Sequence, residues 1–245
     1  MRTEVWQKKT TRLAQYPLIE TIKMNISYAK TELLKWIALV LMLGDHINKF
    51  LFNGNYSDFL FNAGRLCLPI FVFVLAANLV KTDKSTHKRT MLRIFIFGVI
   101  ASVPYYLLGA ALPLNVLFTL LLIVVVIYLM ELRAAPAYFL AAVAFILGGA
   151  FVEYWWPAII MGVALFYFLK YGSKLCAALA LTALVSLFYI NGNHYALLAL
   201  PLILITPKFS AIPRLRWAFY IFYPLHLAAL LLVRIPMAAA GYLFF

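Results

Sequence analysis

The chain has 245 residues, of which 66% are hydrophobic and 12% charged, and its mean hydropathy is +0.95. No soluble core of this size uses so much apolar side chain, so the composition excludes a soluble globular protein and predicts a polytopic membrane protein. The 21 Lys and Arg against 8 Asp and Glu give a net charge of +13, which in a membrane protein is first a topology signal and argues against a nucleic-acid partner.

Residues 1–30 are polar and basic with scattered apolar positions, and they show no pattern of a cleavable signal peptide. We expect them to form a cytoplasmic tail, which could include a short helix on the lipid surface. Residues 31–245 then form the transmembrane domain, and its first span is expected to act as the insertion signal.

The first predicted span, residues 33–52, is long enough to cross a bilayer but carries polar side chains in its second half. A helix rises about 1.5 Å per residue, so His46 lies roughly 20 Å beyond Leu33, past the midplane toward the outer face. Polar groups at this depth need a partner, a water-filled cavity or a function. The group comprises Asp45, His46, Asn48 and Lys49.

Further apolar runs predict eight more spans, and the basic residues alternate with them. If the N-terminus is cytoplasmic, one side collects six Lys and Arg of the tail, five at 81–93, and those at 133, 170, 174 and 208–216. The sequence therefore predicts an all-α bundle of about nine spans with a cytoplasmic N-terminus. The eight spans are residues 65–80, 94–110, 114–131, 136–152, 155–171, 174–190, 194–207 and 217–236.

The adjacent Asp45 and His46 form the first candidate catalytic group. A nearby carboxylate can fix the tautomer of an imidazole and favour proton uptake, which suits a general base. The structural alternative is an i,i+4 ion pair between Asp45 and Lys49.

Three further polar residues open or interrupt spans. Arg65, between Gly64 and Pro69, could bind a phosphate or a carboxylate, stabilise an oxyanion, or extend to the outer headgroups. Asn78 and Asn115 could contact substrate, or could simply hydrogen-bond neighbouring helices.

The last span contains a second histidine, His226, which follows Tyr223 and Pro224 in the segment FYIFYPLHL. Proline frees a backbone carbonyl, and a histidine at this depth is costly in lipid, so we favour a functional His226 over a core histidine and assign Tyr223 to the substrate site. Glu153, at an outer helix end, is expected to be solvated.

The basic loops carry Lys88 and Arg89 before the third span and Arg214 and Arg216 before the last. They satisfy the topology rule, and they would also attract a phosphate-rich cytoplasmic ligand. The sequence contains no metal-binding HExxH, P-loop, dinucleotide-binding motif or GxSxG elbow, so no metal is expected and a histidine-centred membrane site remains.

Five short motifs occur in a familiar order along the membrane domain: DHIN at 45–48, AGR with PIF at 63–71, NL at 78–79, NVLF at 115–118 and YPLHL at 223–227. In these motifs the chain resembles the TraX family, conjugal-transfer proteins associated with N-terminal acetylation of F-type pilin. The resemblance implies a multi-pass acetyltransferase of the bacterial inner membrane, with acetyl-CoA as donor and a pilin amino terminus or another envelope group as acceptor. A distant similarity to integral-membrane acyltransferases implies an essential His46 and a role for Arg65.

Our hypothesis is that acetyl-CoA docks its phosphates against the basic loops and that His46, oriented by Asp45, deprotonates the acceptor, while Arg65 or Asn115 stabilises the oxyanion. Which of His46 and His226 is the base stays open at this point. Two alternatives come from other classes: a proton-coupled small-molecule transporter, and a non-enzymatic factor for pilus or fimbrial assembly.

Overall fold

A computed structural model describes residues 28–52, 57–110, 112–207, 215 and 217–242. Within these ranges the chain is helical and forms no β-strand, and one isolated backbone bridge joins Leu114 to Val152. The predicted all-α class is confirmed for the part of the chain that the structure describes. The predicted tail, residues 1–27 in particular, lies outside it.

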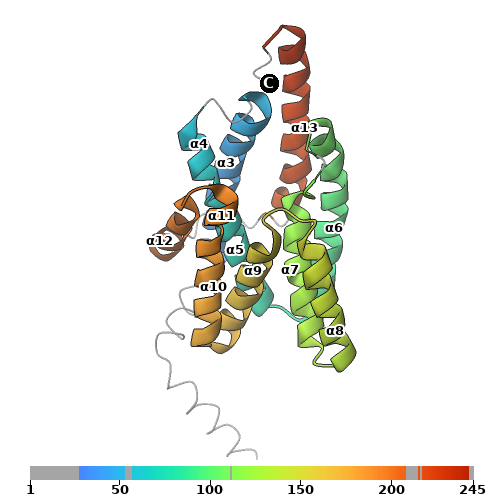
Figure 1. The fold of residues 1–245 in the computed structure, drawn as a ribbon, viewed down its shortest axis with the longest axis vertical. Coiled ribbons are helices and arrows are strands. Elements are labelled where there is room, and N and C mark those ends of the chain that lie inside the picture. The colour runs from blue at the N-terminus through green and yellow to red at the C-terminus, as the bar shows by residue number, and fades with distance from the viewer. Residues whose placement is uncertain (1–27, 53–56, 111, 208–214, 216, 243–245) are drawn as a thin grey trace, which may run out of the picture.

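The first helices of the described chain are α3, α4 and α5, and Figure 1 shows α4 beside the upper part of α3. Helix α3 (Tyr28–Phe52) covers the first predicted span, and the short α4 (Asp58–Gly64) turns back along it. Ser57 caps α4 by accepting a hydrogen bond from the Leu60 N–H, which satisfies one of the free amides at a helix start. The link at Arg65 then leads into α5 (Cys67–Val80), most of whose side chains are buried.

Helices α6 and α7 each begin at a residue whose side chain caps the first turn. Asp83 caps α6 (Lys84–Leu107) by accepting from the Thr86 N–H, and Asn115 caps α7 (Val116–Glu131) by accepting from the Leu117 N–H. Helix α13 (Ala218–Ala239) packs against both α3 and α6. These helices surround the space described below.

The remaining helices complete the bundle on the side of α5 and α7. They are α8 (Ala135–Val143) with the π-helical turn η1 (Ala144–Gly148), α9 (Trp155–Tyr171), α10 (Lys174–Ser186), α11 (Phe188–Asn191), the 3₁₀ turn η2 (Tyr195–Leu198) and α12 (Ala199–Ile205). Every predicted span therefore overlaps a helical segment.

Four of the described helical segments are long and apolar enough to cross a membrane: 58–80, 84–107, 174–191 and 218–239. Helix α3 is 25 residues long but carries more charged side chains than such a segment allows, and four other apolar segments are shorter. The structure supports a membrane protein, and the count of about nine spans stays a prediction.

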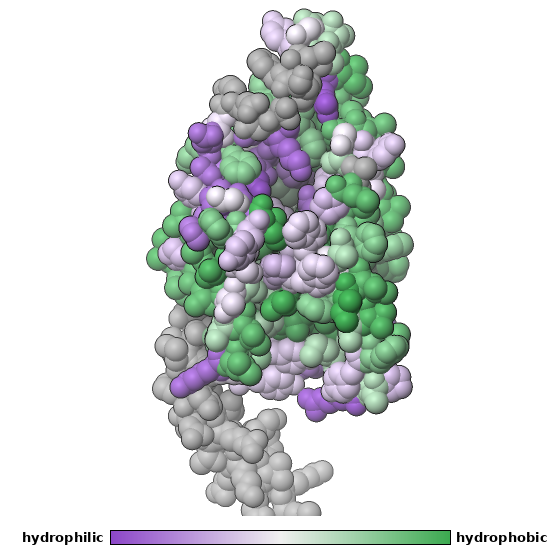
Figure 2. All heavy atoms as spheres, viewed as in Figure 1, coloured by the Kyte–Doolittle hydropathy of each residue, from purple (hydrophilic) through white to green (hydrophobic). Residues whose placement is uncertain are grey.

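The outer surface and the ends of the bundle agree with this assignment. Large apolar side chains such as Leu92 and Val103 of α6 are exposed, as expected of a lipid-facing surface, and Figure 2 shows hydrophobic side chains over much of the middle of the bundle. At one end Lys170 pairs with Glu131, and Arg133 donates to the Tyr171 hydroxyl, so basic residues of two links meet there. We call this the basic end; its cytoplasmic location stays a prediction.

Candidate functional site

The two intramembrane histidines contact each other directly. Nδ1 of His46 on α3 lies 2.7 Å from Nε2 of His226 on α13, and the two rings are nearly parallel, with 12° between their planes. The sequence singled out both residues, but it could not pair them because 180 positions separate them. This pair is the chemical centre of the candidate site.

The protons on the two rings follow from the second bond of His226. Its Nδ1 lies 2.9 Å from the carbonyl oxygen of Phe222, which can only accept, so this nitrogen carries a proton. If both rings are neutral, Nε2 of His226 must then accept the hydrogen bond from Nδ1–H of His46. The remaining nitrogen, Nε2 of His46, has no hydrogen-bond partner among the described residues and carries the lone pair of a potential base.

Aromatic rings hold the histidine pair in place. Phe222 stacks on His226 with ring centroids 5.0 Å apart, and Tyr223 meets both histidine rings edge-on. Tyr223 is 2% exposed, and its hydroxyl is buried without a hydrogen-bond partner within the described part of the chain. A buried hydroxyl without a partner costs free energy, which makes it a candidate for ligand binding.

Asp45 has a different partner from the one expected. Its Oδ1 accepts from Nη2 of Arg65 at 2.6 Å, while Nε of Arg65 donates to the Phe61 carbonyl. The expected contact in which Asp45 orients His46 is therefore absent from this structure: the Asp45 carboxylate bonds to Arg65, and the His46 ring contacts His226. The alternative pair with Lys49 is not formed either; the Lys49 ammonium lies over the Phe50 ring.

The close contact between Asp45 and Arg65 depends on Gly64. A Cβ atom at Gly64 would lie 2.4 Å from the Cβ of Asp45, far inside normal contact distance. Only glycine lets α4 approach α3 this closely, and the next residue, Arg65, then reaches the carboxylate. The AGR motif thus has a packing explanation.

Asn115 is buried and its side chain is fully used in structural bonds. The amide nitrogen donates to the Gly98 carbonyl and to the Ser102 hydroxyl, and the oxygen caps α7. The structure therefore corrects the prediction that Asn115 stabilises an oxyanion; it fixes α7 to α6 instead.

Glu153 was expected to be solvated, but it is partly buried in the link between η1 and α9. Its Oε1 accepts from the Tyr105 hydroxyl at 2.9 Å. Burial raises the pKa of the Glu153 carboxyl, although the nearby Lys49 ammonium opposes the shift. No local pattern indicated this burial, because the contact joins residues 48 positions apart.

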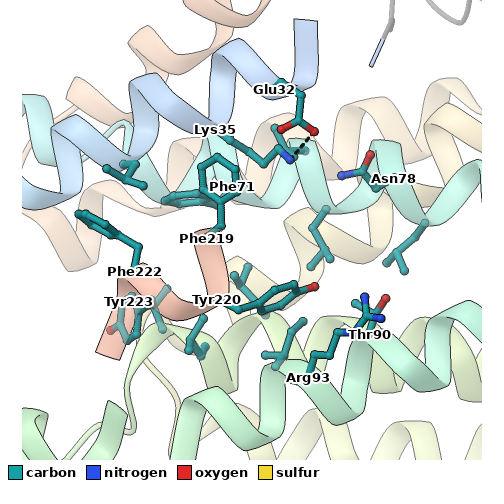
Figure 3. A pocket seen from close by; sticks show the side chains of 18 of the residues that line it. Glu32, Lys35, Phe71, Asn78, Thr90, Arg93, Phe219, Tyr220, Phe222 and Tyr223 are labelled. Atoms are coloured by element: carbon teal, nitrogen blue, oxygen red, sulfur yellow. Dashed lines mark hydrogen bonds and ion pairs between the residues drawn. The ribbon is translucent and has the colours of Figure 1, made fainter. Parts of the chain in front are cut away.

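A cavity of about 400 Å³ lies between α3, α5, α6, α7 and α13, and Figure 3 shows Phe222 and Tyr223 toward one end of it and Thr90 and Arg93 toward the other. His46 and His226 do not line the cavity themselves, but Tyr223 does, and its ring contacts both histidine rings. The other end of the cavity carries Arg89 and Arg93. The cavity also includes the predicted substrate residue Asn78.

Only part of the predicted donor-binding set reaches this cavity. Arg89 lines it, whereas Lys88 does not and instead places its ammonium 5.7 Å from the Tyr128 ring centre. Arg214 and Arg216 lie outside the described residues. Sequence reasoning missed the rim residues Glu32 and Lys35, and it placed Arg93 in the basic loop that would attract a phosphate-rich ligand without naming it as a donor-binding residue.

Comparison with known proteins assigns the chain to a family. The family model described as TraX protein matches residues 30–234, a range that contains both histidines and every described residue lining the cavity. The chain is also 36% identical over 85 residues to Protein TraX of Escherichia coli, a match that covers 34% of this chain and only 32% of that relative. No solved structure matches.

Proposed function

Because this chain belongs to the TraX family, we propose that it is a membrane-embedded acetyltransferase that moves acetyl from acetyl-CoA to an acceptor amine, such as the amino terminus of a pilin. Residues His46 and His226 form its catalytic centre. The bacterial inner membrane is the proposed location.

The observation that carries this proposal is that Tyr223 lines the cavity and also contacts both histidine rings. Arg89 and Arg93 stand at one end of the cavity, and the rings of Phe222 and Tyr223 stand against the histidines at the other. Guanidinium groups suit the phosphates of coenzyme A, and an apolar lining suits its pantetheine arm and thioester. A donor bound in this direction would bring its acetyl group to the histidines.

The tautomers of the pair favour His46 as the base. Its Nε2 takes the proton from the acceptor nitrogen while that nitrogen attacks the thioester carbonyl carbon. The carbon–nitrogen bond forms, the carbon–sulfur bond breaks, and the coenzyme A thiolate leaves and is protonated in turn. His226, anchored on the Phe222 carbonyl, keeps the His46 ring in the required tautomer and orientation.

Tyr223 is the proposed donor to the developing oxyanion. Its hydroxyl has no partner among the described residues, and its ring contacts both histidines. A hydrogen bond to negative charge in a water-poor site is worth more than one to a neutral carbonyl, which favours the transition state. In this account Arg65 pairs with Asp45 and holds α4 and α5 in place, and it does not bind the oxyanion.

The experiment uses the full chain purified in detergent, acetyl-CoA, and a pilin-derived peptide with a free or a chemically blocked amino terminus. We expect thiol release and an acetyl mass increment with the free peptide only. Loss of both in Tyr223→Phe and His46→Ala proteins that remain folded would support the site. If the wild-type protein transfers no acetyl to any amine or hydroxyl acceptor but moves protons with a small solute, the transporter alternative replaces this function.

A further inference from the structure

Glu32 presents an unused carboxylate oxygen to the cavity. Its side chain comes from the first turns of α3, is 3% exposed and lines the cavity. Oε1 accepts from the Lys35 ammonium at 2.5 Å, whereas Oε2 is buried and has no hydrogen-bond partner within the described ranges. A buried carboxylate oxygen without a hydrogen bond costs free energy, and a hydrogen-bond donor on a bound ligand would remove that cost.

The groups around Glu32 restrict what that ligand can be (Figure 3). Asn78 on α5 lines the same part of the cavity, and its amide both donates and accepts hydrogen bonds. Across the cavity, Thr90 and Arg93 of α6 supply a hydroxyl and a fixed positive charge. The ligand should therefore have a hydrogen-bond donor for Glu32 and a ring edge with both a donor and an acceptor for Asn78. It should also carry a negative charge that can lie near Arg93.

An aminopurine nucleotide has these features in one molecule. Its exocyclic amine donates to a carboxylate, its ring nitrogens accept from an amide, and its phosphates pair with guanidinium groups. Pantetheine alone has neither a purine base nor the nucleotide phosphates. A lipid headgroup has no aromatic ring with hydrogen-bonding atoms along its edge.

The position of Glu32 along α3 fits the length of the donor. Glu32 precedes His46 by fourteen residues, about 21 Å along the helix axis at 1.5 Å per residue. That separation is comparable to an extended pantetheine arm, which joins the thioester to the nucleotide in coenzyme A. The base would lie at Glu32 when the thioester lies at His46.

We infer that Glu32 and Asn78 bind the adenine ring of the acetyl donor, with Glu32 Oε2 accepting from the exocyclic amine. This inference rests on the proposed function, because it assigns a part of the donor to the cavity. It makes Glu32 the residue that selects an adenine-bearing donor over a donor with another base.

The test measures binding of three probes to the full chain in detergent: coenzyme A, its deaminated hypoxanthine analogue, and pantetheine. The wild-type protein should bind coenzyme A about tenfold more tightly than the deaminated analogue. Glu32→Leu, which removes the acceptor oxygens, should abolish most of that preference and leave pantetheine binding unchanged. Glu131→Leu is the matched control, since Glu131 also pairs with a lysine but lies outside the cavity.

The outcomes separate this inference from the proposed function. Equal binding of coenzyme A and its deaminated analogue by the wild-type protein overturns the adenine assignment, and this comparison needs no variant. A Glu32→Leu protein that keeps the full preference overturns the role of Glu32. A wild-type protein that binds none of the three probes overturns acetyl-CoA as the donor itself.

Discussion

Nη2 of Arg65 lies 2.6 Å from Oδ1 of Asp45, and this ion pair joins α3 to the link between α4 and α5. Both side chains are largely buried, at 13% and 12% exposed. Asp45 directly precedes His46 in sequence, so the ion pair fixes the helix that carries the proposed base.

Removal of either partner should destabilise the protein. Asp45→Asn or Arg65→Gln leaves an uncompensated charge in a poorly solvated place, so we expect each to cost about 3 kcal/mol. The double variant should cost less than the sum, with a coupling energy of about 1–3 kcal/mol. Thermal unfolding in detergent measures all three, and strictly additive effects would show that the two groups do not interact.

Gly64 provides a second test of the same contact. A Cβ at this position overlaps Asp45, so Gly64→Ala should cost about 1–3 kcal/mol by forcing α4 away from α3. Gly98→Ala is the control, because its added Cβ would meet its nearest neighbours at 3.4–3.5 Å, which is ordinary contact. If the two variants unfold at the same temperature, the close approach of α4 to α3 is not needed.

The sequence predicted the helices well because apolar runs of span length leave few alternatives in lipid. Each predicted span overlaps a helix, and both histidines were identified from their cost at that depth. The pairing of the two histidines could not be predicted. Asp45 and His46 are adjacent in sequence, which suggested that they act together, but neighbouring residues on a helix point in different directions. Asp45 bonds to Arg65 between α4 and α5, and His46 contacts His226 on α13.

The roles of the asparagine and acidic residues were harder to predict. Asn115 looks like a polar residue in a span, but the structure uses it as a helix cap, which depends on where α7 begins. Glu32 precedes the predicted first span, and only the tertiary structure shows that it is buried beside a cavity that residues of α5 and α6 also line. Such facts depend on tertiary contacts between distant segments.

Two acidic residues should affect the pH dependence of stability in opposite directions. Burial raises the pKa of the Glu153 carboxyl, so wild-type stability should fall as pH rises through that raised value, whereas Glu153→Gln should lack this loss. Hydrogen bonds from Thr86 and Ser85 lower the pKa of the Asp83 carboxyl. The ionised Asp83 carboxylate therefore stabilises the folded protein at neutral pH, and this stabilisation is lost as the carboxyl is protonated in acid.

The measurement is thermal unfolding of three proteins from acidic to mildly alkaline pH. As pH rises, the unfolding temperature of Glu153→Gln should increase relative to that of the wild-type protein. The unfolding temperature of Asp83→Asn should decrease relative to wild type over the same pH range. Curves that stay parallel to the wild-type curve for both variants would contradict these assignments.

The cavity predicts which basic residues affect donor binding. Arg93→Ala should raise KM for acetyl-CoA by about tenfold with little change in kcat, because its charge is used equally in the ground and transition states. Added salt should reduce the difference from the wild-type protein. Lys88→Ala, which removes a basic residue of the same helix that does not line the cavity, should leave KM unchanged; equal effects of both variants would indicate a diffuse charge effect only.

The rate of thiol release from acetyl-CoA in the presence of acceptor, compared among wild-type, His46→Ala and His226→Ala proteins, tests the central claim most directly. The account predicts that His46→Ala lowers kcat by about 10²–10⁴, that His226→Ala lowers it less, and that both variants still bind coenzyme A. A His46→Ala protein that is folded, binds coenzyme A and releases thiol at the wild-type rate would contradict it.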